Sequence, residues 1–305
     1  MKPLIRLIPP FLVRFFARPY VAGDSLEQAI ATVDRLWNGR SLLATLDLLA
    51  EDIRLQEQAD QNLATYRRMV AAASALPAPW RPTLSLKPSS YTTRPLQAGG
   101  DAAGSLAAVT AIAEDGARTG VGITIDMESR HWTDFTLAAL QKLHADGHRH
   151  VGAVLQSRLH RTEHDLDRLP AGMRVRLVIG IYREPAEHAL TDKPAMKLRL
   201  LTYAERLLRA GHYVEFATHD EACVRRFVDD VVPRCGVGAD RYEVQMLYGV
   251  PRERLLGELR QRGIRARLYV PFALSWAMAI QYLRRRLDEY PAMMWLVSKN
   301  LIRRR

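Results

Sequence analysis

A short strand-like run followed by a helical pattern recurs eight times along this chain of 305 residues, and this alternation limits the possible folds most strongly. The centres of the runs are about 32 residues apart, the length of one strand-helix unit. Strands that alternate with helices favour a parallel sheet, because each parallel connection needs a crossover. The runs are Leu42–Leu48, Thr83–Lys87, Gly122–Asp126, Val151–Gln156, Val175–Tyr182, Tyr213–Thr218, Tyr242–Leu247 and Arg267–Pro271.

Helical patterns fill the intervals, and glycines follow several of their ends, where a left-handed cap favours this residue. The patterns are Asp52–Leu76, Gly104–Arg118, Asp134–Asp146, Glu163–Leu169, Lys197–Arg209, Glu221–Val232, Pro251–Gln261 and Met278–Glu289. Eight units with mostly apolar strands predict an α/β fold: a closed, distorted (β/α)8 barrel of the TIM type. We expect a helical arm over residues 1–40, the barrel over residues 41–305, and the last helix over the barrel mouth.

A doubly wound open sheet is the main alternative fold. A Rossmann nucleotide site is disfavoured within it, because the two Gly-Val-Gly sequences, at 120–122 and 236–238, precede strands instead of following them.

Composition narrows the class of protein. Apolar residues make up 48% and charged residues 25%, enough for a core and a polar surface. Two cysteines, Cys223 and Cys235, cannot form a disulfide framework, so we expect the protein to reside in the reducing cytoplasm. No apolar run approaches the roughly 20 residues that span a bilayer, so an integral membrane protein is not expected.

The charge is +11, and the first 23 residues contain four basic residues, no acid and many large apolar side chains. This pattern fits a segment that lies peripherally on an anionic membrane surface, such as the inner face of the cytoplasmic membrane. An arm that packs on its own domain is the alternative. No zinc-ligand spacing or RNA-binding signature occurs, so nucleic acid is not an expected partner.

Chemically versatile residues stand at the ends of the predicted strands, where a barrel of this type carries its active site. Arg176 is the sharpest of these signals, since it lies inside an apolar run and an unpaired buried guanidinium is costly. We therefore expect Arg176 to meet an anion or a carboxylate. The other polar residues near strand ends are Lys87, Asp126, Glu128, Gln156, Tyr182, Thr218, His219, Asp220, Gln245 and Tyr269.

The last predicted helix places Tyr282, Arg285, Arg286 and Glu289 on one face, at positions i, i+3, i+4 and i+7. Paired arginines can hold a small carboxylate bidentately, although a solvated helix face is the ordinary alternative. The histidines show no metal-ligand pattern, so no metal is expected.

The chain resembles the proline dehydrogenases, a family whose FAD-bound barrel oxidises L-proline to 1-pyrroline-5-carboxylate and passes the electrons to a quinone. The matching segments occur in order from about residue 20 to the end of the chain. They are LDLLAE (46–51), SLK (85–87), IDME (125–128), VLQS (154–157), VRLV (175–178), GIYREP (180–185), FATHD (216–220), EVQMLYG (243–249) and RRLDEYPA (285–292).

The resemblance implies a role for each matching position. Asp126 and Arg176 resemble the catalytic pair beside the flavin. The positions that resemble substrate contacts are Lys87, Arg285 and Arg286 around the carboxylate, Tyr182, Tyr269 and Tyr282 around the ring, and the additional Leu177 and Glu289. Those that resemble FAD contacts are Met127, Gln156, Ile179, Gly180, Ile181, Lys193, Thr218, His219 and Gln245.

Two segments depart from the family pattern. The usual K-G-A-Y is here Ile179-Gly180-Ile181-Tyr182, which loses a cation on the flavin side and adds bulk. Ala50 replaces the usual glycine of L-L-G-E. Hydroxyproline or another cyclic amine is therefore an alternative substrate. A lyase or aldolase that uses Lys87 as a Schiff-base nucleophile, and a non-catalytic flavoprotein, are alternatives of other classes.

Overall fold

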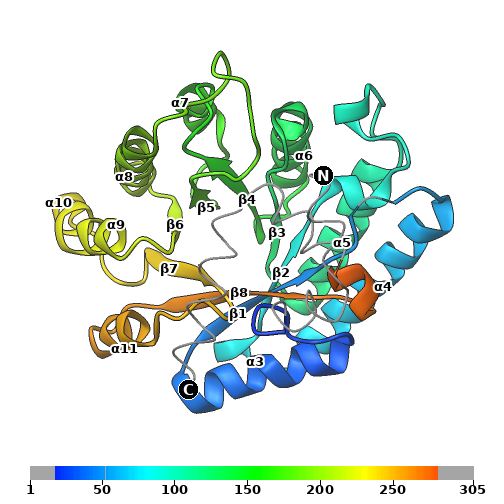
Figure 1. Ribbon diagram of the computed structural model, residues 1–305, viewed down its shortest axis with the longest axis horizontal. Helices are drawn as coiled ribbons and strands as arrows, with labels where there is room; N and C mark the ends of the chain where they lie inside the picture. Colours follow the sequence, from blue (N-terminus) through cyan, green and yellow to red (C-terminus); the bar gives the residue numbers. More distant parts are fainter. Residues whose placement is uncertain (1–17, 52, 281–305) are drawn as a thin grey trace.

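Eight parallel strands close into a barrel in sequence order, from β1 to β8 and back to β1 (Figure 1). The computed structural model describes residues 18–51 and 53–280. The closure confirms the predicted TIM-type barrel and excludes the open sheet. The strands are β1 (Leu43–Leu48), β2 (Thr83–Leu86), β3 (Ile123–Ile125), β4 (Val151–Gln156), β5 (Arg174–Val178), β6 (Tyr213–Ala217), β7 (Tyr242–Leu247) and β8 (Ala266–Phe272).

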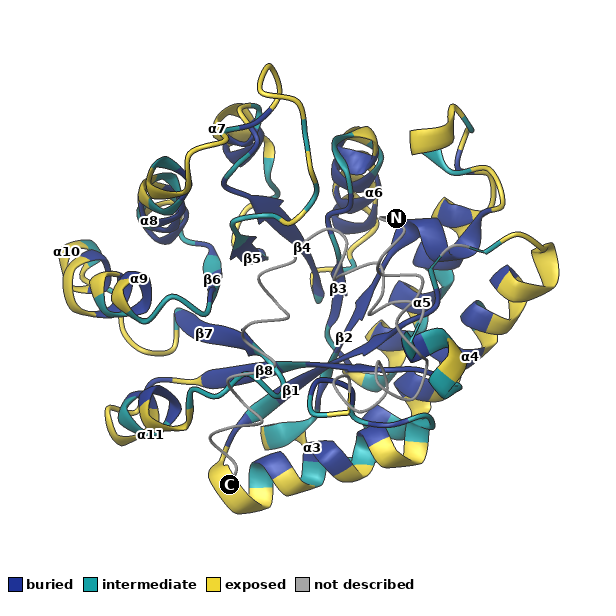
Figure 2. Ribbon diagram, viewed as in Figure 1, coloured by how far each residue is buried: buried dark blue, intermediate teal, exposed yellow. Residues whose placement is uncertain are grey.

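Helices surround the barrel and turn their exposed faces to solvent (Figure 2). The predicted helix Glu221–Val232 is divided, because a π-helical turn, Phe227–Val231, separates α9 from α10. The helices are α3 (Leu26–Arg40), α4 (Gln56–Ser74), α5 (Ser105–Thr119), α6 (Thr133–Ala145), α7 (Thr162–Asp165), α8 (Lys193–Arg209), α9 (Glu221–Arg226), α10 (Val232–Cys235) and α11 (Glu253–Gln261).

The predicted fifth strand is too long. Strand β5 ends at Val178 instead of Tyr182. Gly180 has φ = 100°, a left-handed conformation that a regular strand cannot contain. The chain therefore leaves the barrel wall before Tyr182. Of the predicted helix Met278–Glu289, residues up to 280 are helical, in a turn that begins at 276, and the remainder lies outside the described residues.

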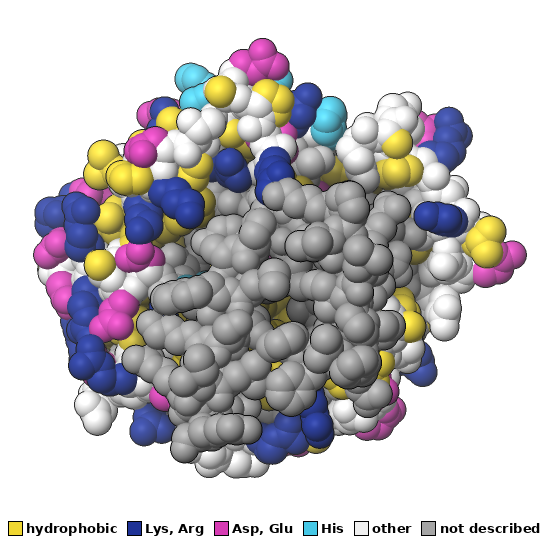
Figure 3. All heavy atoms as spheres, viewed as in Figure 1, with side chains coloured by type: hydrophobic (Ala, Val, Ile, Leu, Met, Phe, Trp, Pro, Cys, Tyr) yellow, Lys and Arg dark blue, Asp and Glu magenta, His cyan; other side chains and the backbone are white. Residues whose placement is uncertain are grey.

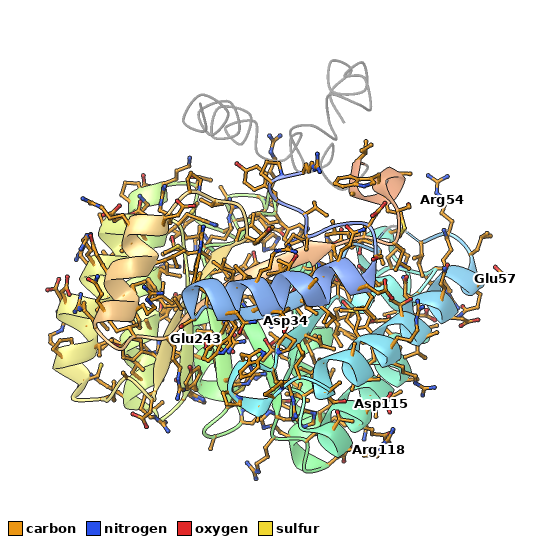
Figure 4. The ribbon with its side chains drawn as sticks, turned by 90° about the horizontal axis from the view of Figure 1, so that it is seen from below. Asp34, Arg54, Glu57, Asp115, Arg118 and Glu243 are labelled. Carbon is orange, nitrogen blue, oxygen red and sulfur yellow. The ribbon has the colours of Figure 1, made fainter. Side chains whose placement is uncertain are left out.

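Helix α3 packs against the barrel wall beside β1 and β8. Ser25 caps the helix by accepting a hydrogen bond from the backbone N–H of Gln28. Ala29, Val33 and Leu36 are buried in the same apolar core as the strands. The described part of the predicted arm is thus attached to the barrel along a whole helix, which lies across its side in Figure 4.

The two faces of the strands differ in chemistry. One set of alternating positions is apolar and buried, as the packing of helices on a barrel requires. It comprises Ala44, Leu46, Leu48, Leu84, Leu86, Ile123, Ile125, Val175, Leu177, Val214, Phe216, Val244, Met246, Leu268 and Val270. The positions between them are largely polar or charged. They comprise Thr45, Asp47, Ser85, Thr124, Gln156, Arg174, Arg176, Glu215, Glu243, Gln245, Arg267 and Tyr269.

The two ends of the barrel are separated clearly in the side view. Arg54 and Glu57, before and within the first turn of α4, mark the end where β1 finishes (Figure 4). Asp115 and Arg118, near the end of α5, mark the opposite end. Basic and acidic side chains are interspersed over the described rim in Figure 3. Within the described ranges, no helix combines the length and apolarity needed to cross a membrane.

Candidate active site

The polar side chains between the apolar strand positions meet inside the barrel. Arg176 on β5 donates from Nη1 to Ser85 Oγ on β2 at 3.0 Å, and from Nε to Gln245 Oε1 on β7 at 2.7 Å. These strands are not neighbours in the barrel, so the contacts must cross its interior. The three side chains are fully or almost fully buried.

Asp126, which follows β3, is the carboxylate that Arg176 meets. Arg176 Nη1 lies 2.9 Å from Asp126 Oδ1, which also accepts a hydrogen bond from Ser85 Oγ at 2.7 Å. The Tyr269 hydroxyl donates to the other oxygen, Oδ2, at 2.7 Å. The sequence prediction that Arg176 pairs with an anion or carboxylate is confirmed. Three donors fix the orientation of this carboxylate.

Lys87 lies on the other side of Asp126 among several acids. Its ammonium is 2.5 Å from Asp47 Oδ1, 3.3 Å from Glu51 Oε1 and 3.7 Å from Asp126 Oδ2. Burial alone would lower the pKa of Lys87, but the charge of Asp47 outweighs it and the pKa is raised well above its usual value. Lys87 therefore remains protonated, which disfavours the Schiff-base alternative because that nucleophile must be a neutral amine.

Tyr269 connects the two cations. Its hydroxyl is 3.4 Å from the Lys87 ammonium, and the Arg176 guanidinium lies over its ring, 5.2 Å from the centroid. Burial and the charge of Asp126 raise the pKa of Tyr269 well above its usual value. The hydroxyl therefore stays protonated and acts as a donor to Asp126.

Two further buried carboxylates, Glu215 and Glu243, help to hold Arg176 in place. Glu215 on β6 lies 2.7 Å from Arg174 and 3.5 Å from the Nε of Arg176. Glu243, inside the barrel in Figure 4, forms a 2.5 Å ion pair with Arg267 and accepts from Gln245 Nε2 at 2.6 Å. Gln245 thereby links the Glu243 pair to Arg176.

Gln156 and Gly180 lie together where β4 and β5 end. Gln156 donates from Nε2 to the carbonyl of Glu128 at 2.7 Å, whereas its Oε1 has no hydrogen-bond partner among the residues that the structure describes. A Cβ added to Gly180 would lie only 2.3 Å from Oε1. Position 180 must therefore be glycine for the Gln156 amide to occupy this place.

Glu128 is buried beside the cluster and accepts from the backbone N–H of Ser89 at 2.9 Å and from its hydroxyl at 2.5 Å. Burial raises the pKa of Glu128 to about 7. This carboxyl group therefore titrates near neutral pH.

Thr218 and His219 follow β6. His219 accepts a hydrogen bond on Nε2 from the backbone N–H of Leu247, at 2.9 Å. Burial, and then the charge of Arg252, lowers the pKa of His219 to about 4. The ring is therefore neutral at physiological pH and fixes the ends of β6 and β7 together.

The remaining predicted positions are not all in the central cluster. Met127 and Leu177 are buried, and Ile179 is half-buried against the core. Ile181 is 47% exposed, and Lys193 is exposed as the first residue of α8. Tyr182 is half-buried after β5. Four predicted positions lie outside the described residues: Tyr282, Arg285, Arg286 and Glu289.

Several residues of the candidate site were not predicted from the sequence. Asp47 and Glu51 lie within a matching segment but received no role, and Ser85, Glu215 and Glu243 were not singled out. A detectable signal was the polar residue at every second position of successive strands, which marks the interior of a barrel. In the described part of the chain, no group of His, Cys, Asp and Glu side chains is placed to hold a metal ion.

Comparison with known proteins places the chain in a family. The family model described as "Proline dehydrogenase" matches residues 29–298. Proline dehydrogenase of Deinococcus radiodurans is 35% identical over 282 residues, which cover 90% of this chain and 86% of the relative. Proline dehydrogenase 1 of Bacillus subtilis strain 168 is 31% identical over 306 residues, which cover 99% of this chain and 96% of the relative.

A solved structure shows the same fold. Proline utilization A of Bdellovibrio bacteriovorus superimposes with a TM-score of 0.80 at 20% identity. The match covers 90% of this chain and 32% of that protein, so this chain spans about a third of its length. The family model and the two bacterial relatives cover most of this chain, and the chain belongs to the proline dehydrogenase family.

Proposed function

We propose that this protein uses bound FAD to oxidise L-proline to 1-pyrroline-5-carboxylate and passes the electrons to a quinone. The observation that carries the proposal is the Arg176–Asp126–Tyr269–Lys87 cluster. It lies inside the barrel, and Lys87 and Asp126 directly follow β2 and β3, at the carboxyl ends where barrels of this type perform chemistry. Family membership supports proline as the substrate.

Two buried polar atoms at the site support a flavin. Arg176 Nη2, a donor, and Gln156 Oε1, an acceptor, have no hydrogen-bond partner within residues 18–51 and 53–280. Leaving such groups unpaired costs about 1–3 kcal/mol each, so a ligand with both acceptors and donors fits here. A flavin ring has both on its polar edge. Gln156, Arg176, Gln245 and the residues after β6, Thr218 and His219, are the proposed contacts.

FAD, when bound, would supply the acceptor for the hydride that leaves C5 of proline, and the amine proton would pass to solvent, so that a C=N bond forms. The protein contributes position and electrostatics. Asp126 orients Arg176 and accepts a hydrogen bond from the Tyr269 hydroxyl. The Tyr269 ring provides a wall for a small substrate. Fixing a substrate in a reactive geometry can remove several kcal/mol from a barrier.

Charge balance supports a role for Arg285 and Arg286, which lie outside the described residues. Lys87 lies within 4 Å of three carboxylates, and Arg176 is shared between Asp126 and Glu215. A substrate carboxylate would add a further negative charge to this set. We therefore propose that Arg285 and Arg286 complete the clamp on the carboxylate together with Lys87, as the family resemblance implies.

The visible spectrum tests the function directly. We expect purified protein to be yellow and to bleach when L-proline is added without oxygen. Bleaching by a cyclic analogue but not by proline would move the assignment to the alternative substrate. Colourless protein that binds no added FAD, or borohydride trapping of a substrate on Lys87, would contradict the proposal.

Location at a membrane is part of the same proposal, because quinones are membrane-soluble. We infer that the basic first 23 residues of the 1–40 arm bring the barrel of residues 41–305 to the cytoplasmic surface of a membrane. Removing residues 1–18 should weaken binding to anionic vesicles. Equal binding by the shortened protein would refute this role.

A further inference from the structure

Arg158, in the loop after β4, is anchored directly beside the end of β5. Its backbone N–H donates to the carbonyl of Ile179 at 3.1 Å, and its own carbonyl accepts from the backbone N–H of Leu190 at 2.8 Å. The position of this residue is therefore fixed from two sides. It adjoins the segment in which isoleucine stands where the family pattern has a lysine.

The side chain of Arg158 crosses Gly180 next to Gln156. A Cβ added to Gly180 would lie 2.9 Å from Arg158 Cδ and 2.3 Å from Gln156 Oε1, so both side chains flank the same glycine. Arg158 Nη1 donates to the carbonyl of Tyr182 at 2.5 Å. Its Nε is buried and has no hydrogen-bond partner among the described side chains and backbone. An unfulfilled donor thus lies close to the unfulfilled acceptor of Gln156.

The charge of Arg158 is only partly compensated. Burial lowers the pKa of Arg158, and the charge of Glu184 opposes this. Glu184, however, is occupied by Arg130, whose backbone N–H and Nη1 lie 2.8 and 3.1 Å from its two oxygens. A half-buried guanidinium with a free donor favours an electron-rich ligand group.

We propose that Arg158, in the loop after β4, is a flavin-site cation, which replaces the lysine that the family pattern carries at position 179, directly after β5. This inference rests on the proposed use of FAD. A cation beside a flavin stabilises the added electron density of its reduced form relative to the oxidised form. Arg158 would therefore both strengthen FAD binding and raise the reduction potential of the bound flavin.

The test compares four variants of the full-length protein with the wild type. Arg158→Met removes the cation, and Arg158→Lys keeps it. The double variant R158M/I179K moves it to the family position. Arg168→Met removes an exposed arginine and controls for the loss of one positive charge. The readouts are the dissociation constant of added FAD and the midpoint potential of bound flavin in a reductive titration.

We expect Arg158→Met to shift the oxidised-to-reduced equilibrium at least 10-fold toward oxidised flavin, which is about 30 mV for a two-electron couple. FAD should bind more weakly. Arg158→Lys and the double variant should recover most of both effects, and Arg168→Met should equal the wild type. A structural role alone would not be rescued by a lysine at position 179, directly after β5.

Two results would overturn the inference. One is a yellow Arg158→Met protein with wild-type FAD affinity and potential. The other is a double variant that recovers neither quantity. Failure of the proposed function is distinguishable, because it is visible in the wild type as colourless protein that binds no added FAD.

Discussion

The Lys87 ammonium lies 2.5 Å from Oδ1 of Asp47, and neither side chain is appreciably exposed. The pair joins the ends of β1 and β2 under the proposed substrate position. Loss of Lys87 leaves the buried Asp47 charge uncompensated, whereas loss of Asp47 leaves Lys87 near Glu51 and Asp126.

A double-mutant cycle should show this coupling. We expect Lys87→Met to lower the free energy of unfolding by about 3–5 kcal/mol, Asp47→Leu to lower it by less because Lys87 keeps Glu51 and Asp126, and the double variant to lose less than the sum. Equilibrium unfolding in urea measures the three losses. Lys142→Met is the matched control, because Lys142 pairs with Asp146 on the surface, and it should cost only about 0.3–0.5 kcal/mol. Additive losses at 47 and 87 would contradict the coupling.

Asp126→Asn should impair catalysis more than folding. The amide keeps the shape of the side chain but removes the charge that holds Arg176 and accepts from Tyr269. Hydrogen bonds to charged groups contribute about 1.5–3 kcal/mol, so we expect kcat/KM for proline to fall roughly 10- to 100-fold. Steady-state assays with a soluble quinone acceptor measure this change. Asp101→Asn, in an exposed pair with Arg94, is the control. Equal kinetics for Asp126→Asn would remove Asp126 from the catalytic pair.

The sequence predicted the barrel well because strand bounds depend on local pattern. Strands β4 and β7 begin and end at the predicted residues, whereas β5 was extended through Gly180, whose left-handed φ cannot be distinguished locally from an ordinary strand glycine. The candidate site was predicted in part. Arg176 stood out as one charge in an apolar run, and it does meet a carboxylate.

The partners of the predicted residues could not be identified from local pattern. Asp47 also stands between two leucines, but its partner Lys87 is 40 residues away and becomes adjacent only when β1 and β2 pair. The same applies to Gln245 and Arg176, which are 69 residues apart. Closure of the barrel creates these contacts, so residue types at strand ends indicate the site but not its network.

Gly180→Ala should cost flavin affinity as well as stability. A left-handed φ costs a residue with a Cβ roughly 1–2 kcal/mol, and here the added methyl would also displace the Gln156 amide. We expect a lower FAD content in the purified protein and a dissociation constant raised at least 10-fold. Gly172→Ala is the matched control, since Gly172 has φ = 69° but open space around its Cβ position. Similar flavin loss in both variants would show that strain alone, not the Gln156 contact, is responsible.

His219 should make the protein less stable in mild acid. Its pKa is about 4 in the folded protein and 6.5 in the unfolded chain, so between these values the unfolded state binds more protons. The stabilisation is therefore complete above pH 6.5 and is lost as the pH falls toward 4, by about 2 kcal/mol after allowance for partial exposure. Glu128, whose folded pKa of about 7 is raised, acts in the opposite direction over pH 4.5–7.

The variant His219→Gln separates these two effects. Glutamine can accept the Leu247 N–H through its amide oxygen but does not titrate, and Glu128 is unchanged. Urea unfolding at pH 7.5 and pH 4.5 should show the wild type losing about 2 kcal/mol more than the variant between the two values. Because the other titrating groups are common to both proteins, the difference reports His219 alone. Parallel losses in the two proteins would mean that the ring is already protonated in the folded state at pH 4.5 at no cost in stability. The hydrogen bond that its neutral form accepts from the Leu247 N–H would then contribute nothing to the pH dependence.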